Sequence, residues 1–125
     1  MQIIKCKFNF DECEQKIKNE IKRLNAILFF EVDHKKNAEE VGLQLNKCKV
    51  LYFGNPRVGT LLMQKKIEIS LDLPLRLALW EKDGECFVEY KLPSEIAKEY
   101  DVESDVLKKM DEFMLTILSQ IRREG

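Results

Sequence analysis

The segment from Gly54 to Thr60 carries the residue types and spacing in this chain that best suit ligand chemistry. Gly54 and Gly59 stand five positions apart, and Thr60 follows the second glycine directly. An apolar run, 50–53, precedes the segment and a predicted helix follows it, so the segment joins a strand to a helix. Backbone N–H groups at such a junction can hold an anion. The spacing is also that of a nucleotide phosphate-binding loop.

Two features of the segment argue against a nucleoside triphosphatase. The lysine that contacts the terminal phosphates in such loops is missing, and Pro56 removes one backbone N–H group. A narrower hypothesis is an anion or carboxylate site at the helix N-terminus, with Asn55, Arg57, Gly59 and Thr60 as the ligand-binding candidates. The alternative is a rigid turn in which Asn55 caps the helix and Pro56 takes its first position.

His34 is the only histidine and therefore the only side chain that normally titrates near neutral pH. It is the candidate catalytic acid or base and a further candidate ligand-binding residue, with a capping or packing role as the alternative. A catalytic histidine needs a partner, and the adjacent Asp33 is better placed to cap a helix. No His or Cys stands at a spacing suited to a metal, so no metal site is predicted.

The four cysteines, Cys6, Cys13, Cys48 and Cys86, form no C-x-x-C pair. The interpretation that the spacing favours is four free thiols acting as small buried hydrophobic residues, with a shared metal site as the second interpretation. The sequence predicts no cofactor.

Length and composition bound the class of protein. With 125 residues the chain fits a single domain, 1–125. Its net charge is −1 and its basic residues are spread along the sequence, which argues against a nucleic-acid partner. The longest apolar run, 26–30, is far shorter than the ~20 residues of a membrane span, and no signal peptide precedes the first strand-like segment. We expect a cytoplasmic protein without a membrane partner.

Hydrophobic periodicity predicts the elements of the first half. Asp11 is expected to cap the first helix, because Glu14 follows at capping-box spacing. Asp33 is expected to cap the second. In order, the pattern predicts a strand over 3–10, a helix from Asp11 through Leu24, a strand over 27–32, a short helix carrying Ala38, Val41 and Leu45, and a central strand over 49–54.

The second half contains the clearest signals. Asp83-Gly84 predicts a two-residue hairpin turn, because both central residues of that turn need positive φ. Trp80 faces away from the Leu75, Leu77 and Leu79 side, so it would anchor an interface if that face stays uncovered. The pattern predicts a helix from Pro56 to about 66, strands around 75–80 and 86–90, a short helix from Pro93 toward Tyr100, and a last helix over 106–121 with Ser104 as its cap.

The last predicted helix has an apolar face wide enough to lie across a whole sheet. Together the elements indicate an α+β fold: a single two-layer domain with a mainly antiparallel sheet of about five strands, two principal helices, and the long C-terminal helix packed across the sheet. Tyr90 is expected to pack in the core with Cys86 and Val88.

Several segments resemble the bacterial and archaeal family called domain of unknown function 302. They are Val32-Asp33-His34, Val41-Gly42-Leu43, Leu51-Tyr52-Phe53-Gly54-Asn55-Pro56, Gly59-Thr60, Leu62-Met63-Gln64, Leu71-Asp72-Leu73-Pro74-Leu75 and Tyr90-Lys91-Leu92-Pro93. The resemblance is strongest over 29–100. It implies a TATA-binding-protein-like β-α-β-sheet-α fold and a homodimer, and it implies no reaction. Leu61 departs from the proline that often follows the Gly-Thr pair.

Two classes of function follow. The first is a homodimeric binding or interaction module that takes a small anionic metabolite or a protein partner near Asn55 and His34. The second is a small enzyme that uses His34 as acid or base, with Asn55 and Thr60 orienting the substrate. The chain lacks a nucleophile elbow, a paired-carboxylate signature and a metal motif, which favours the first class. A shared concavity for His34, Asn55 and Thr60 would favour the second.

Overall fold

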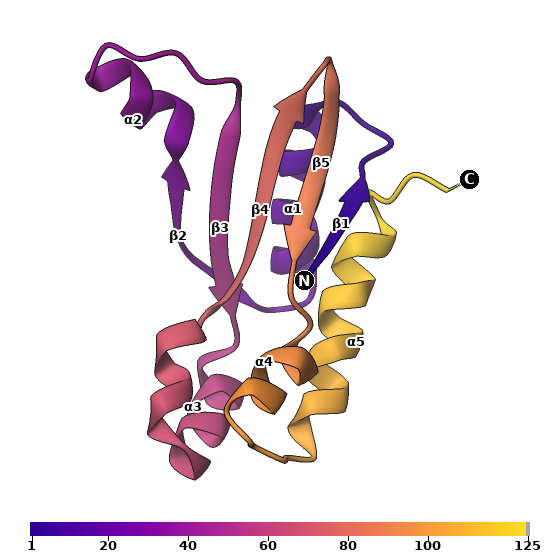
Figure 1. Ribbon diagram of the computed structural model, residues 1–125. Helices are drawn as coiled ribbons and strands as arrows, with labels where there is room; N and C mark the ends of the chain where they lie inside the picture. Colours follow the sequence, from indigo (N-terminus) through magenta and orange to yellow (C-terminus); the bar gives the residue numbers. More distant parts are fainter. Residues whose placement is uncertain (125) are drawn as a thin grey trace.

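A computed structural model describes residues 1–124 of the chain, and it shows an α+β fold (Figure 1). The two longest α-helices, of 14 residues each, are α1 and α5. The elements follow in the order β1 (Gln2–Lys5), α1 (Phe10–Arg23), β2 (Ile27–Asp33), α2 (His34–Glu40), β3 (Cys48–Gly54), α3 (Pro56–Lys65), the 3-10 helix η1 (Ile67–Asp72), β4 (Leu75–Lys82), β5 (Glu85–Tyr90), α4 (Pro93–Glu99) and α5 (Val106–Ser119).

The five strands form one antiparallel sheet in the order β1-β5-β4-β3-β2. The turn between β4 and β5 is the predicted two-residue hairpin, with φ of 53° at Asp83 and 77° at Gly84. In β4 the side chains alternate as predicted: Leu77 and Leu79 are fully buried, whereas Trp80 lies on the other face and is half-buried. The alternation therefore assigns one face of the sheet to the core.

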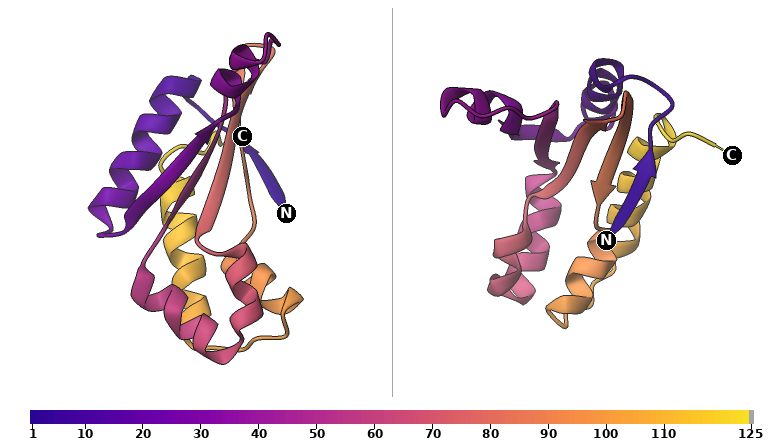
Figure 2. Two further views of the ribbon diagram at one scale, coloured as in Figure 1. Left: turned by 90° about the vertical axis from the view of Figure 1, so that its left-hand side faces the viewer. Right: turned by 45° about the horizontal axis from the view of Figure 1, so that its top comes forward.

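Helices α1 and α5 cover only one face of the sheet (Figures 1 and 2). The fully buried side chains of Ile17 on α1 and of Met114 and Ile117 on α5 join those of the central strands in one hydrophobic core. Tyr90 is buried with them, as the sequence predicted. The helices α3, η1 and α4 gather beyond one end of the sheet (Figure 1). The fold thus has a covered face, an open face and a helical end.

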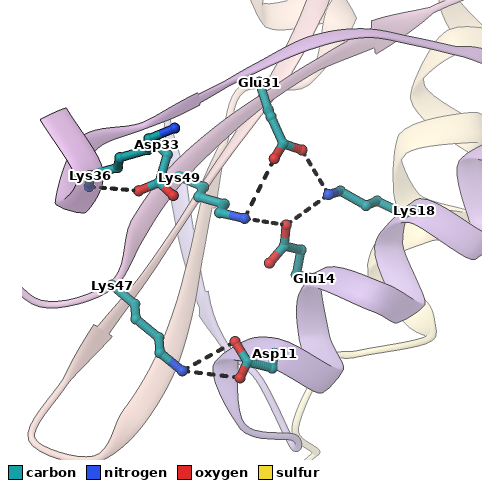
Figure 3. A network of polar contacts seen from close by, with 8 residues as sticks. All are labelled: Asp11, Glu14, Lys18, Glu31, Asp33, Lys36, Lys47 and Lys49. Atoms are coloured by element: carbon teal, nitrogen blue, oxygen red, sulfur yellow. Dashed lines mark hydrogen bonds and ion pairs between the residues drawn. The ribbon is translucent and has the colours of Figure 1, made fainter.

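A network of four charged side chains docks α1 on β2 and β3 (Figure 3). The Glu14 carboxylate on α1 accepts hydrogen bonds from the ammonium groups of Lys18 and Lys49, each at 2.8 Å. Glu31 on β2 pairs with the same two lysines, at 2.7 Å and 3.5 Å. The side chain of Glu14 is only 12% exposed, so this network lies at the margin of the core rather than in open solvent.

The start of α1 differs from the prediction. The first strand ends at Lys5 instead of continuing to Phe10, and Phe10 is the first residue of the helix. The cap is Asn9, whose side chain accepts a hydrogen bond from the Glu12 N–H group at 2.9 Å. Asp11 lies inside the helix and pairs with Lys47. Phe10 is nevertheless buried. The alternating pattern therefore predicted the burial of this side chain correctly, but it placed the residue in a strand instead of a helix.

The second helix is also shorter than predicted. It ends at Glu40, and the side chains of Val41, Leu43 and Leu45 are exposed beyond it. The predicted cap is confirmed, because the Asp33 carboxylate accepts a hydrogen bond from Lys36 N–H at 3.0 Å. Helix α2 has no buried residue, so no tertiary packing extends it toward Leu45.

The predicted cap of α5 is partly confirmed. Ser104 Oγ accepts a hydrogen bond from Val106 N–H at 3.3 Å. Leu115 is 45% exposed, so it lies outside the buried face of the helix. Among the helices of residues 1–124, none is both long and apolar enough to cross a membrane.

Candidate functional site

A cavity of about 450 Å³ lies at the junction of the sheet with its helical end. Five parts of the chain line it: the turn from α1 into the start of β2, the end of β3, the first two turns of α3, the segment that leads into β4, and the N-terminal half of α5. Helix α3 and the start of α5 belong to the helical end of the molecule in Figure 1. The cavity therefore exists only because segments that are distant in the sequence meet there.

The interior of the cavity is apolar. Phe53, with no exposed surface, forms part of its floor, and Phe113 lies against it with the ring centroids 5.9 Å apart. Leu75 and Met110 are buried wall residues from β4 and α5. Such a lining excludes water from apolar parts of a ligand and offers them dispersion contacts.

Three polar side chains stand at the margin of this cavity. Asn55 and Thr60 come from the strand-to-helix segment, Lys109 comes from α5, and all three are exposed. Within residues 1–124, Lys109 forms no ion pair, so its ammonium group is available to an acidic ligand. The site combines an apolar interior with one cation at its edge.

The predicted capping geometry at the start of α3 is confirmed. The Asn55 side chain accepts a hydrogen bond from Arg57 N–H at 3.0 Å, and Pro56 takes the first helical position. The Asn55 carbonyl oxygen accepts from the N–H groups of Val58 and Gly59, each at 3.1 Å.

These hydrogen bonds argue against the hypothesis that the segment binds phosphate through its backbone. The backbone donors that could hold an anion at this helix start are already paired, and Pro56 has none. Thr60 Oγ1 likewise donates to the carbonyl oxygen of Pro56, at 2.6 Å. The segment is thus built as a capped corner, and any anion at this place must be held by side chains.

The structure does not bring the other candidates together. Asn55, Gly59 and Thr60 line the cavity, whereas Arg57 does not. His34 is exposed at the first position of α2, at the far end of the molecule from α3 (Figure 1). The shared concavity required for catalysis by His34 with Asn55 and Thr60 is therefore absent from the described residues 1–124.

Several residues that line the cavity were not among the site residues predicted from the sequence. Phe113 and Met110 belong to the apolar face of the last helix, which was expected to pack against the sheet, and Lys109 was not singled out. The available signal was the position of Lys109 three residues after Val106 and four before Phe113, which puts it beside the apolar face of the last helix. Nothing local indicates that this part of α5 extends past the sheet and lines a cavity.

The cysteines form a second unexpected grouping. Cys6, Cys13 and Cys86 are buried and their sulfur atoms lie within 4.8 Å of one another, whereas Cys48 is half-buried and stands apart. Hydrogen bonds from the thiols of Cys13 and Cys86 lower the pKa of the Cys6 thiol. Burial raises the pKa of the Cys48 thiol, and the charge of Asp33 adds to this.

The fold and cavity define a small two-layer α+β protein with a ligand-sized apolar site. The chain belongs to the family described as domain of unknown function DUF302, whose family model matches residues 2–119. A crystal structure of a conserved DUF302 protein from Bacillus stearothermophilus has the same fold, with a TM-score of 0.82 and 97% of each chain covered. At 13% identity, this likeness concerns the fold alone.

The chain is also similar to curated proteins, and each match covers only part of the longer relative. The chain is 36% identical over 101 residues to proteins named fluoride-specific ion channel FluC 1 in Brucella suis biovar 1 and in Brucella abortus biovar 1. These matches cover 78% of this chain, but only 40% and 37% of the respective relatives. The chain thus spans about two fifths of the length of the curated relatives it matches.

Proposed function

We propose that this protein is a binding module whose cavity takes a small molecule with an apolar body and a carboxylate group. The observation that carries the proposal is the apolar cavity of about 450 Å³ with Lys109 at its margin. This volume falls within the ~300–1,000 Å³ typical of small-molecule sites. An apolar body suits the wall formed by Phe53, Phe113 and Met110, and a carboxylate suits the ammonium group.

The size of each contribution decides what the ligand must look like. Burial of apolar surface is worth about 25 cal/mol per Å², so a chain of several methylenes supplies most of the binding free energy. An exposed ion pair with Lys109 adds only ~0.2–1 kcal/mol. A compact anion such as phosphate has no apolar body to bury and finds the backbone donors of α3 already paired, so only the weak ion pair with Lys109 is left to it. The sequence predicted a small anionic ligand, and the cavity restricts this class to anions that also have an apolar body.

Catalysis by His34 is the alternative, and the geometry supports it less. His34 lies on α2, away from the cavity that Asn55 and Thr60 line. The cavity offers an amide, a hydroxyl and an ammonium group at its margin, without a nucleophile and base in contact. Since the chain spans about 40% of the curated relatives, ion transport is not carried over to it.

Octanoate and 1-octanol form a matched ligand pair for testing the cavity. Octanoate is expected to raise the melting temperature and to bind in calorimetry, because its chain fills the apolar interior while its carboxylate meets Lys109. Octanol should bind about twofold to fivefold more weakly, the factor that an exposed ion pair provides. In Lys109→Met this preference should vanish. Inorganic phosphate should give no shift.

Substitutions that fill the cavity provide a second test of octanoate binding. A Cβ atom at Gly59 would meet only Leu73 Cδ1, at 4.0 Å, so the first atom of a side chain has room there. Gly59→Leu is expected to fill the cavity and abolish octanoate binding. Gly59→Ala is the control: it should keep binding and stabilise α3 by about 0.5–1 kcal/mol, since glycine inside a helix is unfavourable. Equal octanoate binding by both variants would refute the proposed site.

We further propose that the protein is a homodimer joined through the open face of its sheet, with a second copy of this chain as the occupant. This face carries two stacked aromatic pairs: Phe30 with Tyr52, with centroids 4.3 Å apart, and Trp80 with Phe87, at 6.3 Å. Helices α1 and α5 lie on the opposite face (Figure 2). Phe30 is exposed and the other three rings are half-buried, and an aromatic surface of this kind marks an interaction site.

Charge on the open face supports a second copy over an acidic or basic partner. Arg76 on β4 and Glu89 on β5 both belong to this face, by their register with Tyr52 and Ala78. A two-fold axis presents each copy with the same aromatic surface and with charges of both signs. The face is therefore suited to pairing with itself.

Light scattering after size exclusion tests the dimer. The wild-type protein is expected to elute with twice the mass of one chain, and Trp80→Glu with the mass of a single chain, because a buried unpaired carboxylate is costly at an interface. Leu115→Glu, on the exposed margin of α5, is the matched control and should remain dimeric. A monomeric wild type, or a dimer that persists in Trp80→Glu, contradicts the proposal.

A further inference from the structure

Three cysteines that are distant in sequence meet at one buried point of the fold. Cys6 follows β1, Cys13 lies in the first turn of α1, and Cys86 lies in β5. Their exposed fractions are 6%, 0% and 1%, and the three sulfur atoms lie within 4.8 Å of one another. Free cysteine is common in cores as a small apolar residue, but a closed triangle of three sulfur atoms is also a ligand set.

Backbone hydrogen bonds fix Cys6 beside Cys86 and fix Cys13 within the first turn of its helix. The Cys6 N–H group donates to the Cys86 carbonyl oxygen at 2.9 Å, and the Cys13 N–H group donates to Asn9 at 2.9 Å. Cys6 also pairs with Arg122 in an isolated bridge, so the C-terminal segment runs alongside Cys6 at the edge of the sheet. The cluster is therefore positioned by the fold and does not depend on flexible loops.

The spacing of the sulfur atoms suits a single metal ion. A thiolate–metal bond of about 2.3 Å places three sulfur atoms around one ion at mutual distances of about 4 Å. The observed upper limit of 4.8 Å requires only a small inward movement. A larger triangle would need the strands to shift, and a disulfide would use only two of the three sulfur atoms.

The number and type of ligands select the ion. Thiolates are soft ligands that favour Cu(I), zinc and iron–sulfur clusters. Structural zinc is almost always four-coordinate, and iron–sulfur clusters are held by four ligands. Among residues 1–124, the cluster contains three ligands, Cys6, Cys13 and Cys86, without a fourth His, Cys, Asp or Glu. A soft ion that accepts three sulfur ligands fits this set.

We propose that Cys6, Cys13 and Cys86 form a three-sulfur site for one Cu(I) ion. The ion enters already reduced, forms three Cu–S bonds, and displaces thiol protons to the solvent, so no electron transfer is involved. The apolar surroundings shield the bound Cu(I) from water and oxidants. This site lies apart from the cavity at α3 and is independent of the ligand proposed for it.

Competition with a chelator tests the site. Reduced protein under anaerobic conditions is titrated with Cu(I) buffered by bicinchoninate, and native mass spectrometry counts the copper ions per chain. One ion per wild-type chain is expected, with a higher melting temperature and with only three sulfur neighbours by X-ray absorption. A wild type that takes no copper from bicinchoninate, or a bound ion with a fourth ligand, overturns the proposal.

The fourth cysteine supplies the matched control. Cys13→Ala and Cys86→Ala should hold Cu(I) at least about 100-fold more weakly, because the loss of a sulfur ligand costs more than the loss of a residue that only orients a ligand. Cys48→Ala should bind as the wild type does. Circular dichroism identifies variants that fail to fold, and Cys6→Ala then replaces any that do. Folded Cys13→Ala with unchanged copper affinity overturns the proposal, as does loss of copper in Cys48→Ala. Formation of a Cys–Cys disulfide in place of copper binding also overturns it.

Discussion

Phe53→Ala is expected to lower the free energy of unfolding by about 3–5 kcal/mol. Phe53 has no exposed surface and stands in β3 directly between Leu28 of β2 and Leu75 of β4. Its ring also packs against Phe113. Truncation removes a large apolar side chain and joins the space it leaves to the existing cavity, because Phe53 already forms part of the cavity floor. Denaturant unfolding at one fixed protein concentration measures the change.

Two substitutions bracket this prediction. Phe53→Leu keeps most of the volume and should cost less than about 1.5 kcal/mol. Leu115→Ala removes an exposed apolar side chain and should change stability by no more than about 0.5 kcal/mol. If Phe53→Ala cost no more than Leu115→Ala, then Phe53 would not be a core residue and the cavity floor would be assigned wrongly.

Local signals predicted the elements wherever short-range physics decides the structure. The Asp83-Gly84 turn needs positive φ at two neighbouring positions, and the structure shows both. Asn55-Pro56 opens α3 as expected, because the cap and the fixed proline φ act within one turn. The alternation in β4 also assigned Leu77 and Trp80 to opposite faces correctly.

The sequence did not predict features that depend on how segments distant in the chain pack together. Asp11 was the predicted cap, but α1 begins at the buried Phe10, so Asn9 caps the helix instead. The cavity requires α5 to continue past the sheet beside α3, and no residue of α5 encodes that position alone. The cysteine cluster likewise depends on how β1, α1 and β5 meet. The spacing of residues along the chain does not indicate which distant segments will meet in the fold.

The strand-to-helix segment shows how chemistry expected from spacing can be changed by local hydrogen bonds. The glycine spacing predicted a place for a ligand, and Gly59 and Thr60 do line the cavity. The donors that would have bound phosphate are instead paired with Asn55. The proposed ligand site therefore keeps the expected position but relies on apolar contact and Lys109.

Glu14→Gln is expected to lower the free energy of unfolding by about 1.5–3 kcal/mol at neutral pH, the range for hydrogen bonds to charged groups. The Glu14 carboxylate separates the ammonium groups of Lys18 and Lys49 and bonds to each at 2.8 Å (Figure 3). Its side chain is 12% exposed, so water screens these contacts weakly. Without the charge, two lysines at the margin of the core share only Glu31.

The pH dependence of the same network gives an independent check. A hydrogen bond from Lys18 lowers the pKa of Glu31 from its ordinary 4.5, so Glu31 stabilises the fold above that pH and loses this effect as the pH falls through its folded-state pKa. Wild-type stability should therefore decline below about pH 4.5, and Glu31→Gln should decline less steeply. Glu39→Gln removes the exposed partner of Lys35 and serves as the control, with a change of no more than about 0.5 kcal/mol. Equal costs for Glu14→Gln and Glu39→Gln would show that the network does not hold α1 on the sheet.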